Sequence, residues 1–389
     1  MLHVGRQPIY GRDRGLVGYE LLYRTAGAER AVFTDGDRAS LSVMLAAFVE
    51  IGLPRLTSGR TAYINLTRNG ILCEFPRIFP KEGVVFEILE DVAGDADVMQ
   101  ALARMASDGH VFALDDFCES ASNRVLLPWV RILKLDVQAL SDAELAYHAR
   151  AHAHRELIAE KVETREQHER CLELGIGAFQ GYWLAAPKTL SCEITPVSRS
   201  TVLSLLMLLN GKARPSPASL AAVLATDPSM LLRVLRAVPA DYAHGVATVA
   251  EAVHAVGTER LASICTMLVL ATESEEPAPP PEGVMACARL AEILGGLSSR
   301  SGAEEALFAG LLLAATPHTG SRFEMLSTLP LAAVTRDAVI GRSGDLAAIL
   351  DSAARFCATA LSADQSEPIA ALVRDAHHRV QSARDLLLA

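Results

Sequence analysis

The feature that most constrains the fold is a series of short apolar runs, each suited to one β-strand, in the first half of the chain. Helical patterns separate several of these runs, at 38–51, 96–107, 141–153 and 164–174. Strands that alternate with helices predict a parallel sheet, and eight of them predict a closed (β/α) barrel. The eight predicted strands are 2–9, 16–23, 61–66, 84–89, 110–115, 130–135, 156–161 and 177–183.

The first two predicted strands are joined by Gly11–Gly15, a glycine-bounded segment short enough for a hairpin. A hairpin makes its two strands antiparallel, so we expect a TIM-like barrel with one antiparallel strand. Farther along, Thr164–Gln167 has the capping-box pattern that marks the start of a helix.

The strand pattern ends near residue 197, and leucine-, alanine- and valine-rich helical patterns continue from there to residue 389. The acidic, proline-rich segment Glu273–Gly283 predicts a solvated loop within this helical part. The predicted fold class is therefore α/β plus all-α, with an N-terminal domain at 1–197 and a helical domain at 198–389.

Composition restricts the class of protein. The chain has 389 residues and a formal charge of −10, so we expect no nucleic acid polymer as a partner. Its seven cysteines show no CxxC spacing, which argues against a disulfide framework and predicts a reduced, cytoplasmic protein. The N-terminal residues lack a signal-peptide pattern, and the apolar stretches near 201–209 and 261–271 predict no membrane insertion.

Polar residues at the ends of the predicted strands indicate a site. The carboxyl ends of barrel strands converge on one face, where several acids would repel one another without a cation. Oxygen ligands of this kind suit Mg²⁺ or Mn²⁺, and two such ions can activate a water for attack on a phosphate. The strand-end residues are Asn65, Glu90, Asp115, Asp116, Lys134 and Glu160.

A simpler interpretation exists for each position alone, because a single acid at a strand end is commonly a turn residue or a helix N-cap. The adjacent acids Asp115 and Asp116 are weak evidence when taken without the others. Five polar strand ends in sequence are harder to explain as turns, and this ordered set favours a metal site.

The ordered set also resembles the EAL domain family. Gln7-Pro8-Ile9 is similar to the opening motif of these domains, and Gly18–Arg24 is similar to the signature that names them, with Leu21 in place of alanine. The further matching segments are Asn65, Glu87–Glu90, Asp115–Phe117, Lys134–Asp136, Ala159–Thr164 and Gln180–Pro187.

EAL domains hydrolyse cyclic di-GMP to linear pGpG with Mg²⁺ or Mn²⁺, so the resemblance implies this ligand and a two-metal site. It implies metal binding by Glu20, Asn65, Glu90 and Asp115, with Asp116 and Glu160 at the catalytic centre. It gives Lys134 and Gln180 supporting roles at the water or the phosphate. Gln7, Arg24 and Pro187 would contact the dinucleotide, and a homodimer is expected.

Two departures from the family pattern leave two hypotheses open. The loop Cys118–Asn123 lacks the glycines of the family's DFGTGYSS segment and adds Glu119, and Lys161 replaces a glycine. The first hypothesis is a cyclic-di-GMP phosphodiesterase with a regulatory helical domain. The alternative is a weak or inactive EAL domain that acts as a cyclic-di-GMP sensor or an interaction scaffold.

The helical half resembles an HDOD domain, a relative of HD phosphohydrolases that lacks their metal site. The segment Ser219–Leu235, built around Asp227-Pro228, and the segment Val249–Gly257 carry this resemblance. No His-Asp dipeptide occurs in the chain, which argues against a metal phosphohydrolase here. We therefore expect a regulatory role and an unknown protein partner bound through this half.

Overall fold

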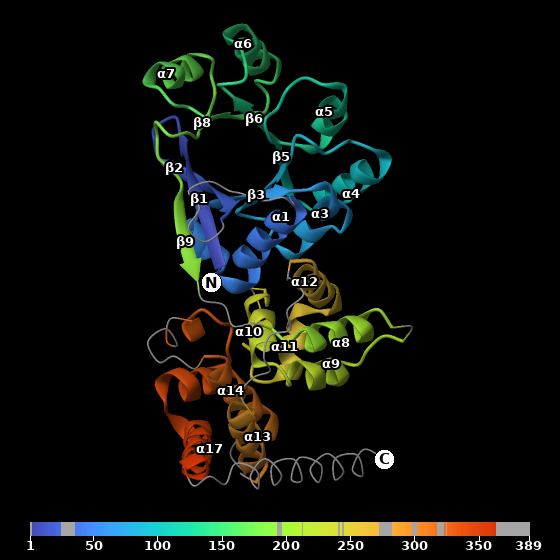
Figure 1. Cartoon of the computed structure of the whole chain (residues 1–389), viewed down its shortest axis with the longest axis vertical. Helices are drawn as coiled ribbons and strands as arrows, with labels where there is room; N and C mark the ends of the chain where they lie inside the picture. Colours follow the sequence, from blue (N-terminus) through green and yellow to red (C-terminus); the bar gives the residue numbers. More distant parts are fainter. Residues whose placement is uncertain are drawn as a thin grey trace. The chain divides into compact units, whose positions relative to one another are not determined.

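The computed structural model describes residues 2–24, 36–192, 197–211, 213–239, 242, 245–271, 282–297, 302–316, 323 and 325–362. The chain divides into two units, Met1–Ile194 and Thr195–Ala389 (Figure 1). All of the strands that the structure describes lie in the first unit.

Eight strands of the first unit close into a barrel, and a ninth lies outside it (Figure 1). Pairing runs from β2 through β8, then through β1, and β1 pairs back to β2 to close the ring. The strands are β1 (Leu2–Gly11), β2 (Leu16–Tyr23), β3 (Thr61–Leu66), β4 (Val84–Ile88), β5 (Val111–Leu114), β6 (Ile132–Asp136), β7 (Glu156–Glu160), β8 (Ala178–Phe179) and β9 (Lys188–Cys192).

Strand β1 is antiparallel to both of its barrel neighbours, whereas β2 to β8 are parallel. The predicted barrel with one antiparallel strand is therefore confirmed. The end of β1 pairs with β8 at Tyr10 and Gly11, and its beginning pairs with β9 from Leu2 to Arg6. Strand β9 was not expected, and β8 is shorter than the predicted strand at 177–183.

Helices cover the outside of the barrel and have clear start signals. Ser141 begins α6 and Thr164 begins α7 with complete capping boxes, and Asp95 accepts two backbone N–H groups at the start of α4. The capping box predicted at Thr164 is thus confirmed. The helices of this unit are α1 (Gly36–Leu45), α2 (Leu53–Thr57), α3 (Arg68–Leu72), α4 (Ala96–Ser107), α5 (Ala121–Leu126), α6 (Asp142–Ala151) and α7 (Arg165–Glu173).

The barrel interior contains an apolar layer built by residues of six strands. Side chains alternate between the two faces of a strand, so every second residue of a barrel strand points inward. The inward residues of this layer are fully or almost fully buried. They are Ile9, Tyr63, Val85, Ala113, Ile132 and Ile158.

The second unit is helical over its described residues, with one isolated β-bridge between Val246 and Leu331. Asp227 is buried and caps α10 by accepting the N–H groups of Ser229 and Met230. Its helices are α8 (Arg199–Leu209), α9 (Pro217–Leu224), α10 (Pro228–Arg236), α11 (Val249–Val256), α12 (Thr258–Ala271), α13 (Glu282–Leu297), α14 (Ala303–Ala315), α16 (Ala333–Arg336) and α17 (Gly344–Ser362).

Over the described part of the chain, no individual helix has both the length and the apolar character needed to cross a bilayer. The helices α11 and α12 meet those requirements only when taken together, and they are bent by 93° at the break between them.

Candidate active site at the barrel mouth

A polar layer lies directly above the apolar layer of the barrel. Two residues farther along each parallel strand, the chain places a polar side chain that points the same way. These residues lie at the carboxyl ends of the strands, which is the face where barrel enzymes carry their active sites. They are Asn65 above Tyr63, Glu87 above Val85, Asp115 above Ala113, Lys134 above Ile132 and Glu160 above Ile158.

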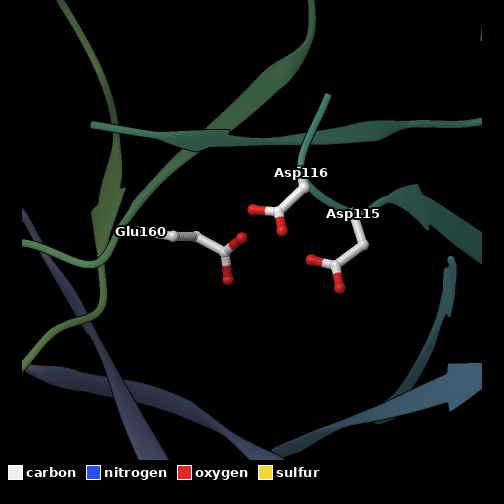
Figure 2. A group of neighbouring side chains, drawn as sticks. All are labelled: Asp115, Asp116 and Glu160. Atoms are coloured by element: carbon white, nitrogen blue, oxygen red, sulfur yellow. The ribbon is translucent and has the colours of Figure 1, made fainter. Parts of the chain in front are cut away.

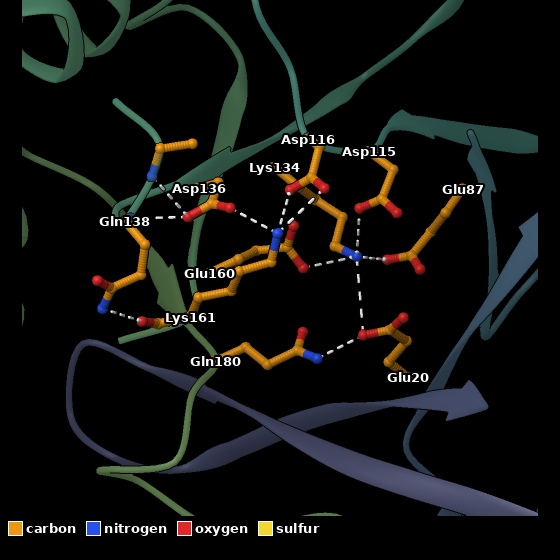
Figure 3. A network of polar contacts seen from close by, with 11 residues as sticks. Glu20, Glu87, Asp115, Asp116, Lys134, Asp136, Gln138, Glu160, Lys161 and Gln180 are labelled. Atoms are coloured by element: carbon orange, nitrogen blue, oxygen red, sulfur yellow. Dashed lines mark hydrogen bonds and ion pairs between the residues drawn. The ribbon is translucent and has the colours of Figure 1, made fainter. Parts of the chain in front are cut away.

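The Lys134 ammonium occupies the centre of this layer (Figure 3). Its Nζ lies 2.7 Å from carboxylate oxygens of Glu87 and Glu160 and 2.8 Å from Asp115 Oδ1. A fourth carboxylate, Glu20 on β2, is 3.8 Å away. Lys134 is only 1% exposed, so this one cation is shared by four acids out of contact with bulk water.

Gln180 connects β8 to the cluster. Its Nε2 donates a hydrogen bond to Glu20 Oε2, and its backbone is held by hydrogen bonds to Ala159 and Val162. The next residue must be glycine, because a Cβ at Gly181 would lie 2.1 Å from the backbone oxygen of Val162. This close approach fixes Gln180 beside the end of β7.

Asp115, Asp116 and Glu160 form a group suited to one cation. Each offers a carboxylate oxygen, and these oxygens lie within 4.8 Å of one another. Figure 2 shows the three carboxylates facing a common space from β5 and β7. Asp116 has a φ of 41°, an uncommon backbone conformation for a residue other than glycine. That turn places its carboxylate across from Glu160 rather than along the strand.

A second lysine borders this group. Lys161 Nζ lies 3.0 and 3.1 Å from the two oxygens of Asp116 and 2.5 Å from Asp136 Oδ2 (Figure 3). Asp136 is held in turn by the backbone N–H groups of Gln138 and Ala139. Burial alone would lower the pKa of Lys161, but its hydrogen bonds to the two aspartates outweigh burial and raise the pKa.

The electrostatics of the cluster are those of crowded, buried acids. Burial raises the pKa of Glu87 and of Glu160 well above the usual range, and neighbouring carboxylates add to the shift while Lys134 opposes it. Burial would also raise the pKa of Asp115, but Lys134 outweighs it and the pKa is lowered. Burial would lower the pKa of Lys134, yet its four acidic neighbours hold that pKa well above its usual value.

The residues present fit a hard divalent cation. The Oε2 atom of Glu87 and the side-chain oxygen of Asn65 are buried and accept no hydrogen bond from any residue that the structure describes. The other carboxylate oxygen of Glu87 lies 2.7 Å from Lys134 Nζ, which offsets its charge. Buried oxygens without a donor are costly unless another partner binds them.

The net negative charge of the site also favours a bound cation. The site holds more carboxylates than ammonium groups, and its ligand atoms are oxygens, which Mg²⁺, Mn²⁺ and Ca²⁺ prefer. The carboxylates are Glu20, Glu87, Asp115, Asp116, Asp136 and Glu160, and the ammonium groups are Lys134 and Lys161. A cation bound here would offset the remaining negative charge and satisfy the free oxygens.

The structure brings together most of the predicted site residues but not Glu90. Strand β4 ends at Ile88, so Glu90 lies exposed in the following turn, while Glu87 is fully buried and contacts Lys134. Glu87, and not Glu90, therefore lies among the carboxylates around Lys134. Alternation from Val85 would have found it, because Glu87 is the next inward position on the strand.

The three predicted nucleotide contacts lie on or near β1. Gln7 is opposite Glu20 in the β1–β2 pairing, so it borders the carboxylates. The Arg24 side chain lies against Gly5 of β1 and donates to the backbone oxygen of Tyr23 at 3.1 Å. Pro187 directly precedes β9. Contacts of these residues with a ligand stay predictions.

The loop that departs from the family pattern is ordered by its own side chains. Ser120 caps α5, and Asn123 donates to the Cys118 carbonyl at 2.9 Å. Glu119 pairs with Arg124 at 2.9 Å, and its hydrogen bond with Tyr147 lowers the pKa of the Glu119 carboxyl. Glu119 is therefore an ionised acid in the loop that follows Asp115 and Asp116.

Comparison with known proteins shows what part of the first unit is similar to. Residues 65–187 match the family model for the EAL domain, and this segment carries the polar layer from β3 to β8. The chain is also 32% identical over 195 residues to the YuxH protein of Bacillus subtilis, which covers 48% of each chain.

A second curated relative is the cyclic di-GMP phosphodiesterase CdgJ of Vibrio cholerae. It is 32% identical over 193 residues, which covers 48% of this chain and 44% of CdgJ. The chain thus spans about half the length of the curated relatives it matches.

Two solved structures are also similar. The YkuI protein of Bacillus subtilis, in complex with cyclic di-GMP and calcium, is 22% identical, with a TM-score of 0.39 and coverage of 49% of this chain and 56% of YkuI. The BlrP1 protein of Klebsiella pneumoniae, in a complex with manganese and cyclic di-GMP, is 21% identical, with a TM-score of 0.41 and coverage of 48% and 56%.

Proposed function

We propose that the EAL domain is a metal-dependent phosphodiesterase that hydrolyses cyclic di-GMP to linear pGpG. The observation that carries the proposal is the layer of buried oxygens around Lys134, in which one oxygen of Glu87 and the side-chain oxygen of Asn65 lack a donor among the described residues. The relative CdgJ, named as a cyclic di-GMP phosphodiesterase, supports the choice of substrate.

Two sets of ligands share Asp115. Glu20, Asn65 and Glu87 with Asp115 would hold one Mg²⁺ or Mn²⁺, and Asp116 and Glu160 with Asp115 would hold another. Bound there, such ions would lower the pKa of a water and stabilise negative charge on the phosphate.

The protein's own groups contribute orientation and charge. Lys134 fixes the directions of Asp115, Glu87 and Glu160 and offsets part of their repulsion. Gln180 holds Glu20 by its amide N–H and keeps a buried side-chain oxygen free of any donor among the described residues. Glu160, at the end of β7 and 2.7 Å from Lys134 Nζ, would face the second ion.

The dinucleotide would bind across the mouth of the barrel. Gln7 and Arg24 offer amide and guanidinium donors on and next to the β1–β2 hairpin, where they can meet phosphate and base oxygens. Pro187 offers an apolar surface at the start of β9. These contacts would leave the phosphodiester above the carboxylates.

Replacing Asp115 by Asn tests the proposal. The variant keeps the size of the side chain and removes one negative charge between the two ligand sets. We expect turnover to fall at least about 100-fold, or about 2.7 kcal/mol of transition-state stabilisation. Binding of cyclic di-GMP without metal should change much less. Formation of pGpG and calorimetric binding are the measurements, and a variant as fast as the parent would contradict the assignment.

A sensor that binds cyclic di-GMP without hydrolysing it is the second candidate. Two features favour it: the ionised Glu119 in the loop after the aspartates, and the ammonium of Lys161 on Asp116. Two results together would support the sensor. The parent and Glu119→Gly would both bind cyclic di-GMP in the presence of Ca²⁺, and neither would form pGpG in the presence of Mn²⁺.

We further propose that the second unit is an HDOD domain that regulates the EAL domain or binds a protein partner. In support, the Asp227-Pro228 pair that carries the resemblance has a structural role, since Asp227 caps α10 and also accepts the Ser198 N–H at 2.7 Å. Hydrogen exchange of the full chain with and without cyclic di-GMP tests the coupling. Unchanged exchange throughout 198–389 would argue against it.

A homodimer is also proposed for the full-length chain. Sedimentation velocity across a range of protein concentrations is the test. A single species at the monomer mass at every concentration would contradict the proposal.

A further inference from the structure

Lys161 stands where the EAL motif has a glycine, and its backbone still adopts the conformation that favours glycine. Its φ is 55°, in the left-handed region that residues with a side chain rarely occupy. It directly follows Glu160 at the end of β7. Such a conformation persists where the surroundings hold it in place, and it is often found at functional sites.

Contacts of the Lys161 side chain and backbone stabilise this left-handed conformation. Lys161 Nζ lies within 3.1 Å of both oxygens of Asp116 and 2.5 Å from Asp136. Its backbone oxygen accepts a hydrogen bond from the Gln138 amide at 3.0 Å. The ammonium thus bridges the ends of β5, β6 and β7 at the edge of the carboxylate group.

This ammonium contacts one of the three acids that could hold a cation. Asp116 is one of the three acids whose oxygens lie within 4.8 Å of one another, and both of its oxygens already contact Lys161 Nζ (Figure 3). A divalent ion that uses Asp116 must therefore displace the ammonium or bind beside a like charge. In the other ligand set, Glu87 and Asp115 contact Lys134 directly, and Lys161 acts on Asp115 only as a nearby charge.

We propose that Lys161 acts as a tethered cation at Asp116, so that the EAL domain binds one divalent ion tightly and a second one only weakly. The catalytic consequence rests on the proposed phosphodiesterase function: hydrolysis becomes limited by occupancy of the second position. The metal-binding consequence does not depend on that function and is measured separately.

A plain structural role is the competing explanation, since the same ion pairs could only fix the loops after β5 and β7. Two substitutions separate the explanations. Lys161→Met keeps the length of the side chain and removes the charge. Lys161→Gly removes the side chain and suits the left-handed backbone, so it should fold without strain.

The experiment is Mn²⁺ titration of the full chain without nucleotide, by calorimetry and by electron paramagnetic resonance of free Mn²⁺. For the parent we expect one tight site and a second site at least about tenfold weaker, in line with a like charge a few ångströms away. In both variants the second site should tighten about tenfold. Arg165→Met is the control, since it removes a positive charge paired with exposed Glu169 on α7.

Equal Mn²⁺ isotherms for the parent, Lys161→Met and Lys161→Gly would overturn the inference, whatever their turnover. If the second site tightens but no variant yields pGpG, the inference holds and the proposed phosphodiesterase fails. If all proteins yield pGpG and their isotherms coincide, the phosphodiesterase holds and Lys161 only anchors the loops. Circular dichroism melts confirm that each variant is folded.

Discussion

The counterion role of Lys134 leads to a prediction about stability without metal. Its ammonium lies within 2.8 Å of Glu87, Asp115 and Glu160, and it is almost completely buried. Lys134→Met keeps an unbranched apolar side chain in the barrel and removes the charge. The acids are then left with no cation inside the layer until a metal binds.

The size of the effect follows from burial. Removing one partner of a buried ion pair costs about 3–5 kcal/mol. For a domain of roughly this size, 1 kcal/mol corresponds to about 2–4 °C in Tm. We therefore expect the barrel of Lys134→Met to melt about 6–20 °C lower than the parent in a chelator at neutral pH.

The loss should depend on pH with a definite sign. Burial raises the pKa of Glu87 and Glu160 in the folded protein, so these carboxyls keep protons at pH values where the unfolded chain has lost them. Stability without metal therefore falls as pH rises above the ordinary glutamate pKa. Removing Lys134 raises both pKa values further, so the variant should lose more stability at pH 8 than at pH 5.5.

Scanning calorimetry of the full chain in a chelator, at both pH values and then with Mn²⁺, is the assay. The deficit should be larger at pH 8 and should shrink with Mn²⁺, because a divalent ion takes over the neutralising role. Lys188→Met, at an exposed lysine on β9, is the control. A deficit that is equal at the two pH values and insensitive to Mn²⁺ would refute the counterion argument.

Three further predictions concern single positions. Glu87→Gln should weaken Mn²⁺ binding at least about tenfold, whereas Glu90→Gln, in an exposed turn, should change it less than about twofold. A larger loss of Mn²⁺ affinity in Glu90→Gln than in Glu87→Gln, measured by calorimetry, would indicate that Glu90 is the ligand. Gly181→Ala should lower the Tm and slow hydrolysis together, because its Cβ would lie 2.1 Å from a backbone oxygen; an unchanged melt would contradict this. A maleimide should label exposed Cys118 in the native protein but reach Cys171, whose pKa burial raises to about 11, only after unfolding, as peptide mass spectrometry can check.

The barrel could be predicted because its strands are continuous apolar runs. In parallel strands covered by helices, both faces are buried, so β4 and β5 are composed almost entirely of residues that mark a strand by composition. Strand β8 was predicted too long for a local reason. Gly181 turns the chain against the loop after β7, although the residues that follow it still read as a strand.

The choice between Glu87 and Glu90 shows the limit of reading strand ends. The apolar run continues through Leu89, so composition places the strand end beside Glu90, while pairing with β3 and β5 ends at Ile88. Only the alternation of inward and outward residues, counted from Val85, selects Glu87. The contact of Lys161 with Asp116 is harder to predict from the sequence. The two residues lie 45 positions apart, and Lys161 has a left-handed backbone conformation.

We propose that the carboxylates around Lys134 support metal-dependent hydrolysis of a cyclic dinucleotide. The most direct test is to incubate the purified full chain with cyclic di-GMP and Mn²⁺ in ¹⁸O-labelled water and to analyse the product by mass spectrometry. We expect pGpG that carries one solvent oxygen in its new phosphate group. Its formation should require Mn²⁺, stop in a chelator and be strongly reduced in Glu87→Gln. Intact cyclic di-GMP after prolonged incubation with Mn²⁺, or pGpG formed equally fast by Glu87→Gln, would contradict it.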